Sequence, residues 1–113
     1  MPNASRKRAI FRVDKFVVPQ QVRAEFMARV EKTRDLLDTF DGCLQNLVLE
    51  QISGPGTFNV VTMVEWASEH ALEKARETVA SHYRDEEFDP QAFLSRLGVV
   101  ADMANYSEHE AMV

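Results

Sequence analysis

The sequence is poor in the residues that typify secreted and membrane-bound proteins. Its 113 residues include one cysteine, Cys43, so no disulfide can form within the chain and an oxidising compartment is not indicated. No apolar run approaches the roughly 20 residues that a membrane-spanning helix needs. The segment after the first basic residues is too charged for a signal peptide. These absences predict a cytoplasmic protein with no membrane partner.

Basic residues are also in short supply. Lys and Arg number 13 against 18 Asp and Glu, which gives a formal net charge of −5. Because a nucleic-acid-binding surface needs a concentrated positive patch, we expect no nucleic acid partner. The three histidines include no pair at i, i+4, so the ligand spacing of a zinc site is missing and no metal site is predicted.

What the sequence does contain is a regular succession of strand and helix patterns. Alternating β-branched and aromatic residues predict strands over 10–18, 44–52, 58–66 and 99–106. Apolar residues recur every three or four positions from Val22 to Phe40, which predicts a helix that stops at Asp41–Gly42. Ser68 is a suitable N-cap for a second helix, and Asp89 for a short third one.

The order of these elements predicts the fold class. Strand, helix, strand, strand, helix, strand is the ferredoxin-like βαββαβ arrangement, an α+β fold. We expect a four-stranded antiparallel sheet with the helices on one face. The length is sufficient for a single domain, with its core over about 10–106 and flexible tails outside that range.

Strand alternation sorts the side chains of the sheet onto two faces. One face is nearly all apolar, and we expect it to pack on the helices; it contains Val13, Val17, Leu47, Leu49, Val61 and Met63. The other face mixes polar and large apolar groups; it contains Arg12, Asp14, Phe16, Asn46, Val48, Glu50, Val60, Thr62, Val64 and Trp66.

The mixed face suggests two properties. An uncovered patch with this many apolar groups needs a partner, so we expect a second copy of the chain to cover it in a homodimer. Apolar walls with a few polar groups are also typical of a small-ligand pocket, and Trp66 would form one end of it.

Two segments carry a resemblance to a known family. The segment 41–44, DGCL, resembles the PGxL motif of the antibiotic biosynthesis monooxygenase family, and 64–72, VEWASEHAL, is similar to its xEWxSxEAL strand-to-helix signature. The resemblance extends over 11–106. It implies a dimeric α+β barrel and a cofactor-independent monooxygenase acting on an aromatic polyketide- or quinol-like small molecule, in which O₂ reacts with a substrate anion.

The resemblance assigns roles residue by residue. Trp66 matches a tryptophan of the polyketide oxygenases, whereas Thr62 stands in place of their Asn and Leu72 in place of their Tyr. The candidate catalytic residues are Trp66, Thr62, His82 and Arg12. The candidate substrate-binding residues are Asp14, Phe16, Asn46, Val48, Val64 and Tyr83.

Two alternatives are kept open. Haem-degrading relatives carry a haem-ligating His late in the second helix, where this chain has His82, but they also carry a strand-one Asn, where it has Arg12 and Asp14. This departure makes haem degradation the less favoured hypothesis. The other alternative is a non-catalytic dimeric module of the same fold that binds a small ligand.

Overall fold

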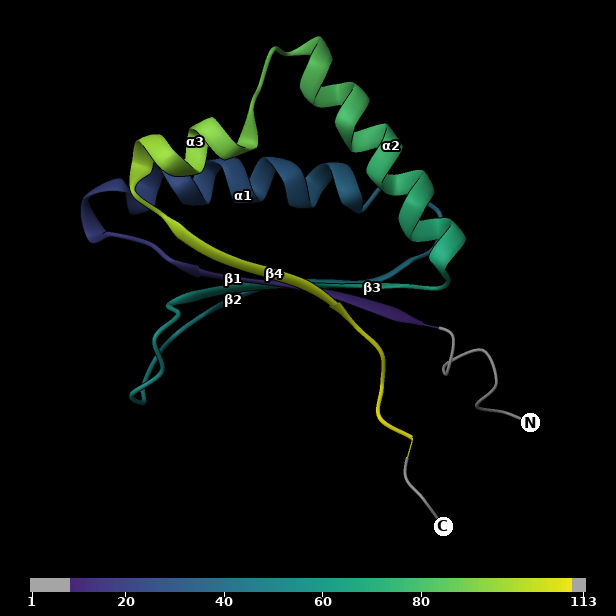
Figure 1. The fold of residues 1–113 in the computed structure, drawn as a ribbon, viewed down its shortest axis with the longest axis horizontal. Coiled ribbons are helices and arrows are strands. Elements are labelled where there is room, and N and C mark those ends of the chain that lie inside the picture. Colours follow the sequence, from purple (N-terminus) through teal and green to yellow (C-terminus); the bar gives the residue numbers. More distant parts are fainter. Residues whose placement is uncertain (1–8, 111–113) are drawn as a thin grey trace.

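The computed structural model describes residues 9–110, which form one sheet with helices on a single face (Figure 1). The predicted tails lie largely outside these residues. The elements in chain order are β1 (Ile10–Val17), the short 3₁₀ helix η2 (Gln20–Val22), α1 (Arg23–Leu37), β2 (Cys43–Glu50), β3 (Val60–Trp66), α2 (Glu69–Asp85), α3 (Pro90–Leu97) and β4 (Val100–Tyr106).

The sheet has the predicted ferredoxin-like topology. Its strands lie in the order β2-β3-β1-β4, and each neighbouring pair is antiparallel. The two central strands, β1 and β3, place Phe16 opposite Val60 and Ile10 opposite Trp66. The fold class predicted from the sequence is therefore confirmed.

Helix ends follow the predicted capping residues, with one exception. The Ser68 hydroxyl accepts a hydrogen bond from the Ala71 amide at 3.1 Å, and Asp89 caps α3. The first helix, however, ends at Leu37, before the predicted stop at Asp41–Gly42. Gly42 has φ +84°, and a Cβ there would lie 2.7 Å from the Ala71 Cβ. Its role is thus to let the chain pass close to α2 rather than to end α1.

The prediction of which sheet face meets the helices is wrong. The mixed face is the buried one, since Val60 and Trp66 are only 0% and 3% exposed, whereas Leu47 and Leu49 on the nearly all-apolar face are 37% and 49% exposed. Figure 1 shows all three helices on one side of the sheet. Both faces carry many apolar residues, so the polarity of a face does not reveal which one the helices cover. A second copy cannot cover the mixed face, because the helices already do.

The core under the helices consists of two clusters. The first joins β1, β3, α1 and the α3–β4 region through Phe16, Val18, Phe26, Val60, Leu97 and Val99. The second joins β3 to α2 through Val64, Trp66, Leu72 and Ala75. Members of both clusters line the same cavity, so the helix layer and the sheet do not close into one continuous core.

Candidate functional site

A cavity of about 480 Å³ lies between the sheet and the helices. Side chains from all four strands line it on one side, and side chains from α1, α2 and α3 line it on the other. Its size falls within the range of small-molecule sites. The mixed composition of this sheet face therefore belongs to a cavity inside one copy of the chain.

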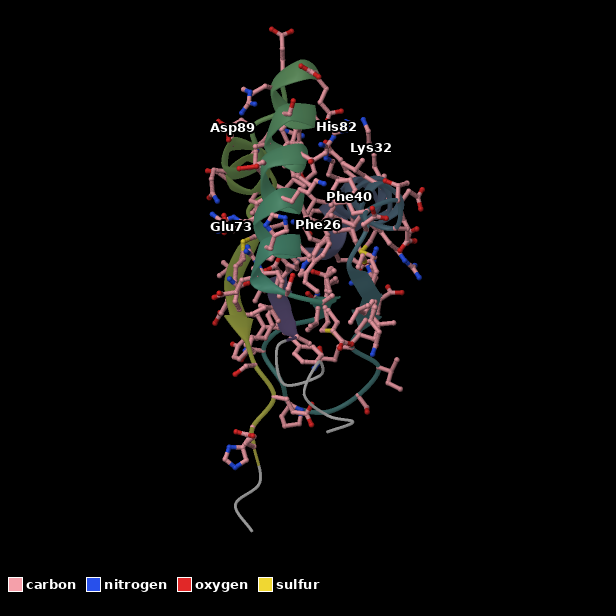
Figure 2. All side chains as sticks on the ribbon, turned by 90° about the vertical axis from the view of Figure 1, so that its right-hand side faces the viewer. Phe26, Lys32, Phe40, Glu73, His82 and Asp89 are labelled. Atoms are coloured by element: carbon pink, nitrogen blue, oxygen red, sulfur yellow. The ribbon has the colours of Figure 1, made fainter. Side chains whose placement is uncertain are left out.

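The structure brings together all the predicted site residues except His82. Those that line the cavity are Arg12, Asp14, Phe16, Asn46, Val48, Thr62, Val64, Trp66 and Tyr83. His82 is exposed and lies towards the upper end of α2, above the level of Phe26 in Figure 2. Adjacent helix residues point about 100° apart, so Tyr83 faces the cavity and His82 does not.

The polar floor of the cavity is built by strand register. Asp14 lies directly opposite Thr62 on β3, and in the next row Arg12 lies opposite Val64. Directly opposed side chains on antiparallel strands have Cβ atoms about 5 Å apart. Arg12, Asp14 and Thr62 therefore converge on one patch, while Trp66 lies roughly 13 Å along the strand from Thr62.

Arg12 and Asp14 form an ion pair on this floor. The Arg12 Nε donates a hydrogen bond to Asp14 Oδ1 at 2.6 Å, and their side chains are 32% and 19% exposed. Burial raises the pKa of the Asp14 carboxyl above 3.8, although the hydrogen bond and charge of Arg12 partly oppose the rise. The site thus holds a carboxylate that is more basic than an ordinary aspartate.

Trp66 forms an inner wall of the cavity. Its side chain is 3% exposed, and its ring lies 6.4 Å from the Phe40 ring, centroid to centroid. A buried indole of this kind offers a flat apolar surface to a ligand. The structure therefore gives Trp66 a packing role in the second cluster and a surface in the cavity at the same time.

Asn46 has most of its hydrogen-bonding capacity engaged elsewhere. Its amide nitrogen donates to the Arg34 carbonyl at 3.0 Å and to Asp38 Oδ1 at 2.9 Å. These bonds fasten β2 to the end of α1 and occupy both amide hydrogens. What Asn46 offers the cavity is its carbonyl oxygen, which can accept a hydrogen bond from a ligand hydroxyl.

Arg29 also lines the cavity, although it is not among the predicted site residues. Arg29 pairs with Glu86, and Glu25, four positions before it, pairs with Arg96 instead. The Arg29 guanidinium carbon lies 3.4 Å from the centre of the Phe88 ring. Arg29 follows Phe26 by three positions, so the apolar stripe of α1 was a signal that could have placed it inward.

Two aromatic residues near the α2–α3 connection, Phe88 and Phe93, were also missed. Phe88 packs against Tyr83 and Phe93, with ring centroids 5.1 Å and 5.3 Å apart, and all three line the cavity. Phe88 directly follows the charged run RDEE at 84–87, so no apolar periodicity marks it in the sequence. The connection therefore contributes a wall of the site.

Other reactive groups are sparse in the described part of the chain. Residues 9–110 contain no group of three or more His, Cys, Asp or Glu side chains able to hold a metal ion. They also contain no helix long and apolar enough to cross a membrane. Burial and the nearby charge of Asp38 raise the pKa of the Cys43 thiol, so it is protonated and unreactive at neutral pH.

Comparison with known proteins identifies the family. A family model described as antibiotic biosynthesis monooxygenase matches residues 9–87. This chain belongs to the antibiotic biosynthesis monooxygenase family. The match includes α1, the first three strands and α2, which together provide most of the cavity lining. A search of curated proteins finds no match.

Solved structures show the same fold as this monooxygenase-family chain. A conserved protein from Methanosarcina mazei Go1 aligns with TM-score 0.69 and 20% identity, over 93% of this chain and 97% of the other. SnoaB, a cofactor-independent oxygenase from Streptomyces nogalater, aligns with TM-score 0.63 and 17% identity, over 93% and 97%. An ethyl tert-butyl ether D family protein from Bacillus halodurans C-125 aligns with TM-score 0.60 and 15% identity, over 89% and 99%.

Proposed function

We propose that this protein is a cofactor-independent monooxygenase acting on an aromatic polyketide- or quinol-like small molecule. The observation that carries the proposal is the partly buried Arg12–Asp14 pair on the floor of an otherwise largely apolar cavity. A flat aromatic phenol would place its rings against the walls and its hydroxyl on this pair. Similarity in fold to SnoaB, whose description is that of a cofactor-independent oxygenase, supports the same reaction class.

The first step is removal of a proton from the substrate hydroxyl. Arg12 occupies Asp14 Oδ1, while Oδ2 accepts no hydrogen bond from any residue within 9–110. Asp14 therefore accepts the proton through Oδ2, and its raised pKa makes it a better base. The Arg12 guanidinium stabilises the phenolate that results, and Thr62, directly opposite Asp14, donates a hydrogen bond to the same oxygen.

The second step is reaction of the electron-rich anion with O₂. One electron passes from the anion to O₂, and the resulting superoxide and substrate radical join at a ring carbon to form a hydroperoxide. Loss of water then converts that carbon to a carbonyl. The substrate loses two hydrogen atoms and gains one oxygen atom, and the second oxygen atom leaves as water. The apolar walls exclude water from the anion during these steps.

Oxygen uptake tests the proposal. Metal-stripped protein is mixed with a panel of aromatic hydroquinones, and dissolved oxygen is followed against an autoxidation blank. We expect uptake above the blank, a loss of about 10²-fold or more in Asp14→Asn because the base is removed, and a loss in Trp66→Ala. Asp35→Asn is the matched control, since Asp35 is exposed on α1 and does not line the cavity.

The outcomes separate an enzyme from a binding module. Uptake equal to the blank across the panel contradicts the monooxygenase. If calorimetry then still detects binding of the same compounds, the protein is a non-catalytic small-ligand-binding module of the family. Uptake that survives in Asp14→Asn contradicts the assignment of the base and moves the chemistry away from the Arg12–Asp14 floor.

We also propose that the protein is a homodimer formed by the helix-free face of the sheet. That face carries apolar side chains on all four strands, including Leu49, which is 49% exposed, and Val100, which is 60% exposed. Exposed apolar surface of this kind marks an interaction site. Two copies of one patch can pack face to face around a two-fold axis, which would bury both faces at once.

Sedimentation of the purified protein tests the dimer. We expect the wild-type mass to be twice that of the chain and Leu49→Asp to sediment as a monomer, because dimerisation would bury its charge without a partner. Ala28→Asp adds the same charge at an exposed position in the helix layer and should stay dimeric. A monomeric wild type, or a dimeric Leu49→Asp, would contradict this surface.

A further inference from the structure

We infer that the ligand of this cavity carries a carboxylate and that Arg29 binds it. The inference deepens the proposed function and rests on it only in taking the cavity as the ligand site. The charges along the cavity wall are the starting observation. Four arginines line the cavity and Asp14 is its one acidic lining residue among those described, in a chain whose net charge is −5. The cationic residues are Arg12, Arg29, Arg34 and Arg76.

Three of these arginines are accounted for without a ligand. Arg12 is neutralised by Asp14. Arg34 lies 3.6 Å from a Glu31 carboxylate oxygen and is 40% exposed. Arg76 donates to Glu73 at 2.9 Å and is 60% exposed. Water screens the charges of the two exposed residues, so neither is a strong anion site.

Arg29 differs from them in burial and in an unused donor. Its side chain is 17% exposed, and its Nε is buried with no hydrogen-bond partner among the described residues. Its only ion pair within residues 9–110 is with Glu86, made through Nη2. A buried N–H without an acceptor is costly, so the hydrogen-bonding capacity of Arg29 is not met within the described residues. Its Nη1 also has no hydrogen-bond partner among them and is not fully buried, so Nη1 is the donor that a ligand in the cavity can reach.

The aromatic residues around Arg29 fix the orientation of its guanidinium. Its carbon lies 3.4 Å from the Phe88 ring centre and 5.2 Å from that of Tyr83. Stacking of this kind covers the flat face of the guanidinium and leaves its N–H edge for an acceptor. Carboxylates form short, charge-assisted hydrogen bonds with such an edge.

The positions of the two polar sites define the shape of the ligand. The Arg12–Asp14 pair lies on β1, on the sheet side of the cavity, and Arg29 lies on α1, on the helix side. A ligand that reaches both is a flat aromatic with a hydroxyl at one end and a carboxylate at the other. We therefore assign the substrate class as aromatic hydroxy acids, with the reacting hydroxyl at Asp14 and the carboxylate at Arg29.

Calorimetric titration with a matched pair of probes tests this assignment. The probes are 6-hydroxy-2-naphthoate and its methyl ester, which share the ring and the hydroxyl but differ in charge. We expect the acid to bind at least about tenfold more tightly than the ester, because it gains a charge-assisted hydrogen bond in a partly desolvated site. Arg29→Gln should abolish this difference. Glu86→Gln should enlarge it, because Glu86 competes for the same guanidinium.

Arg76→Gln is the control for general attraction of anions. It removes an equal charge from the same cavity at a position that is 60% exposed, and the acid preference should persist. Equal binding of acid and ester to the wild type overturns the inference, and so does a preference that survives in Arg29→Gln or is lost equally in Arg76→Gln. If Arg29→Gln does not fold, a preference unchanged in Glu86→Gln overturns it.

Binding is measured here without turnover. The acid preference with no oxygen uptake would therefore contradict the monooxygenase and leave the carboxylate site in place. Oxygen uptake with no acid preference would support the monooxygenase and contradict the carboxylate site.

Discussion

Removal of Arg12 provides a quantitative test of the Arg12–Asp14 pair. The hydrogen bond and the charge of Arg12 both lower the pKa of Asp14, while burial raises it. In Arg12→Met only the burial effect remains, so the pKa of Asp14 rises further. A cation within hydrogen-bonding distance lowers an aspartate pKa by about 1–3 units. Because the Arg12 side chain is 32% exposed, solvent screens the pair, so we expect the rise to lie at the lower end of this range.

The assay is the pH dependence of kcat/KM for oxygen uptake, which reports the pKa of the essential base in the free protein. Activity needs ionised Asp14, so the wild-type rate rises with pH through a pKa above the ordinary value of 3.8. In Arg12→Met this rising limb of the pH profile should lie at higher pH. Arg76→Met removes an exposed arginine from the same cavity and should leave the limb in place. A limb that stays fixed or moves to lower pH in Arg12→Met would refute the reasoning.

Two further predictions concern stability. Gly42→Ala should lower the free energy of unfolding by roughly 1–3 kcal/mol in thermal or urea denaturation, because the positive φ and the 2.7 Å approach to the Ala71 Cβ both oppose a side chain; an unchanged midpoint would contradict this account of the α2 approach. Arg29 and Lys32 lower the pKa of Glu86 from 4.5 to about 2. The stability from this pairing is therefore present above pH 4.5 and lost as the pH falls towards about 2. Glu86→Gln should flatten the decline in that window, and an equally steep decline would show that the pairing contributes nothing.

Local sequence signals were sufficient for the elements and their order. The N-caps Ser68 and Asp89 and the alternation of the strands depend on neighbours within a few residues, and they placed the elements correctly. Local signals could not show which face of the sheet packs against the helices. Leu47 and Leu49 are as apolar as Phe16 and Val60, so the choice depends on which side the helix connections take, and alternation along a strand does not carry that information.

In the candidate site, too, features set by nearby residues were predictable and features set by distant residues were not. Strand alternation grouped Arg12, Asp14 and Thr62 correctly on one face, because residues on one strand face stay together whichever side the helices cover. The inward direction of Arg29 could have been predicted from its spacing to Phe26, but its partners Phe88 and Glu86 could not, because they lie far away in the sequence. His82 was chosen by resemblance in position, but a displacement of one residue from Tyr83 turns a helical side chain to the solvent.

The division of the core into two clusters gives the ligand a structural role. The cavity separates the Phe16–Phe26 cluster from the Trp66–Leu72 cluster, so a bound aromatic ring would touch both and act as the missing part of the hydrophobic core. Any compound that binds only the folded chain raises its stability in proportion to the logarithm of its concentration over its Kd. The melting temperature therefore becomes a screen for substrates that needs no knowledge of the reaction.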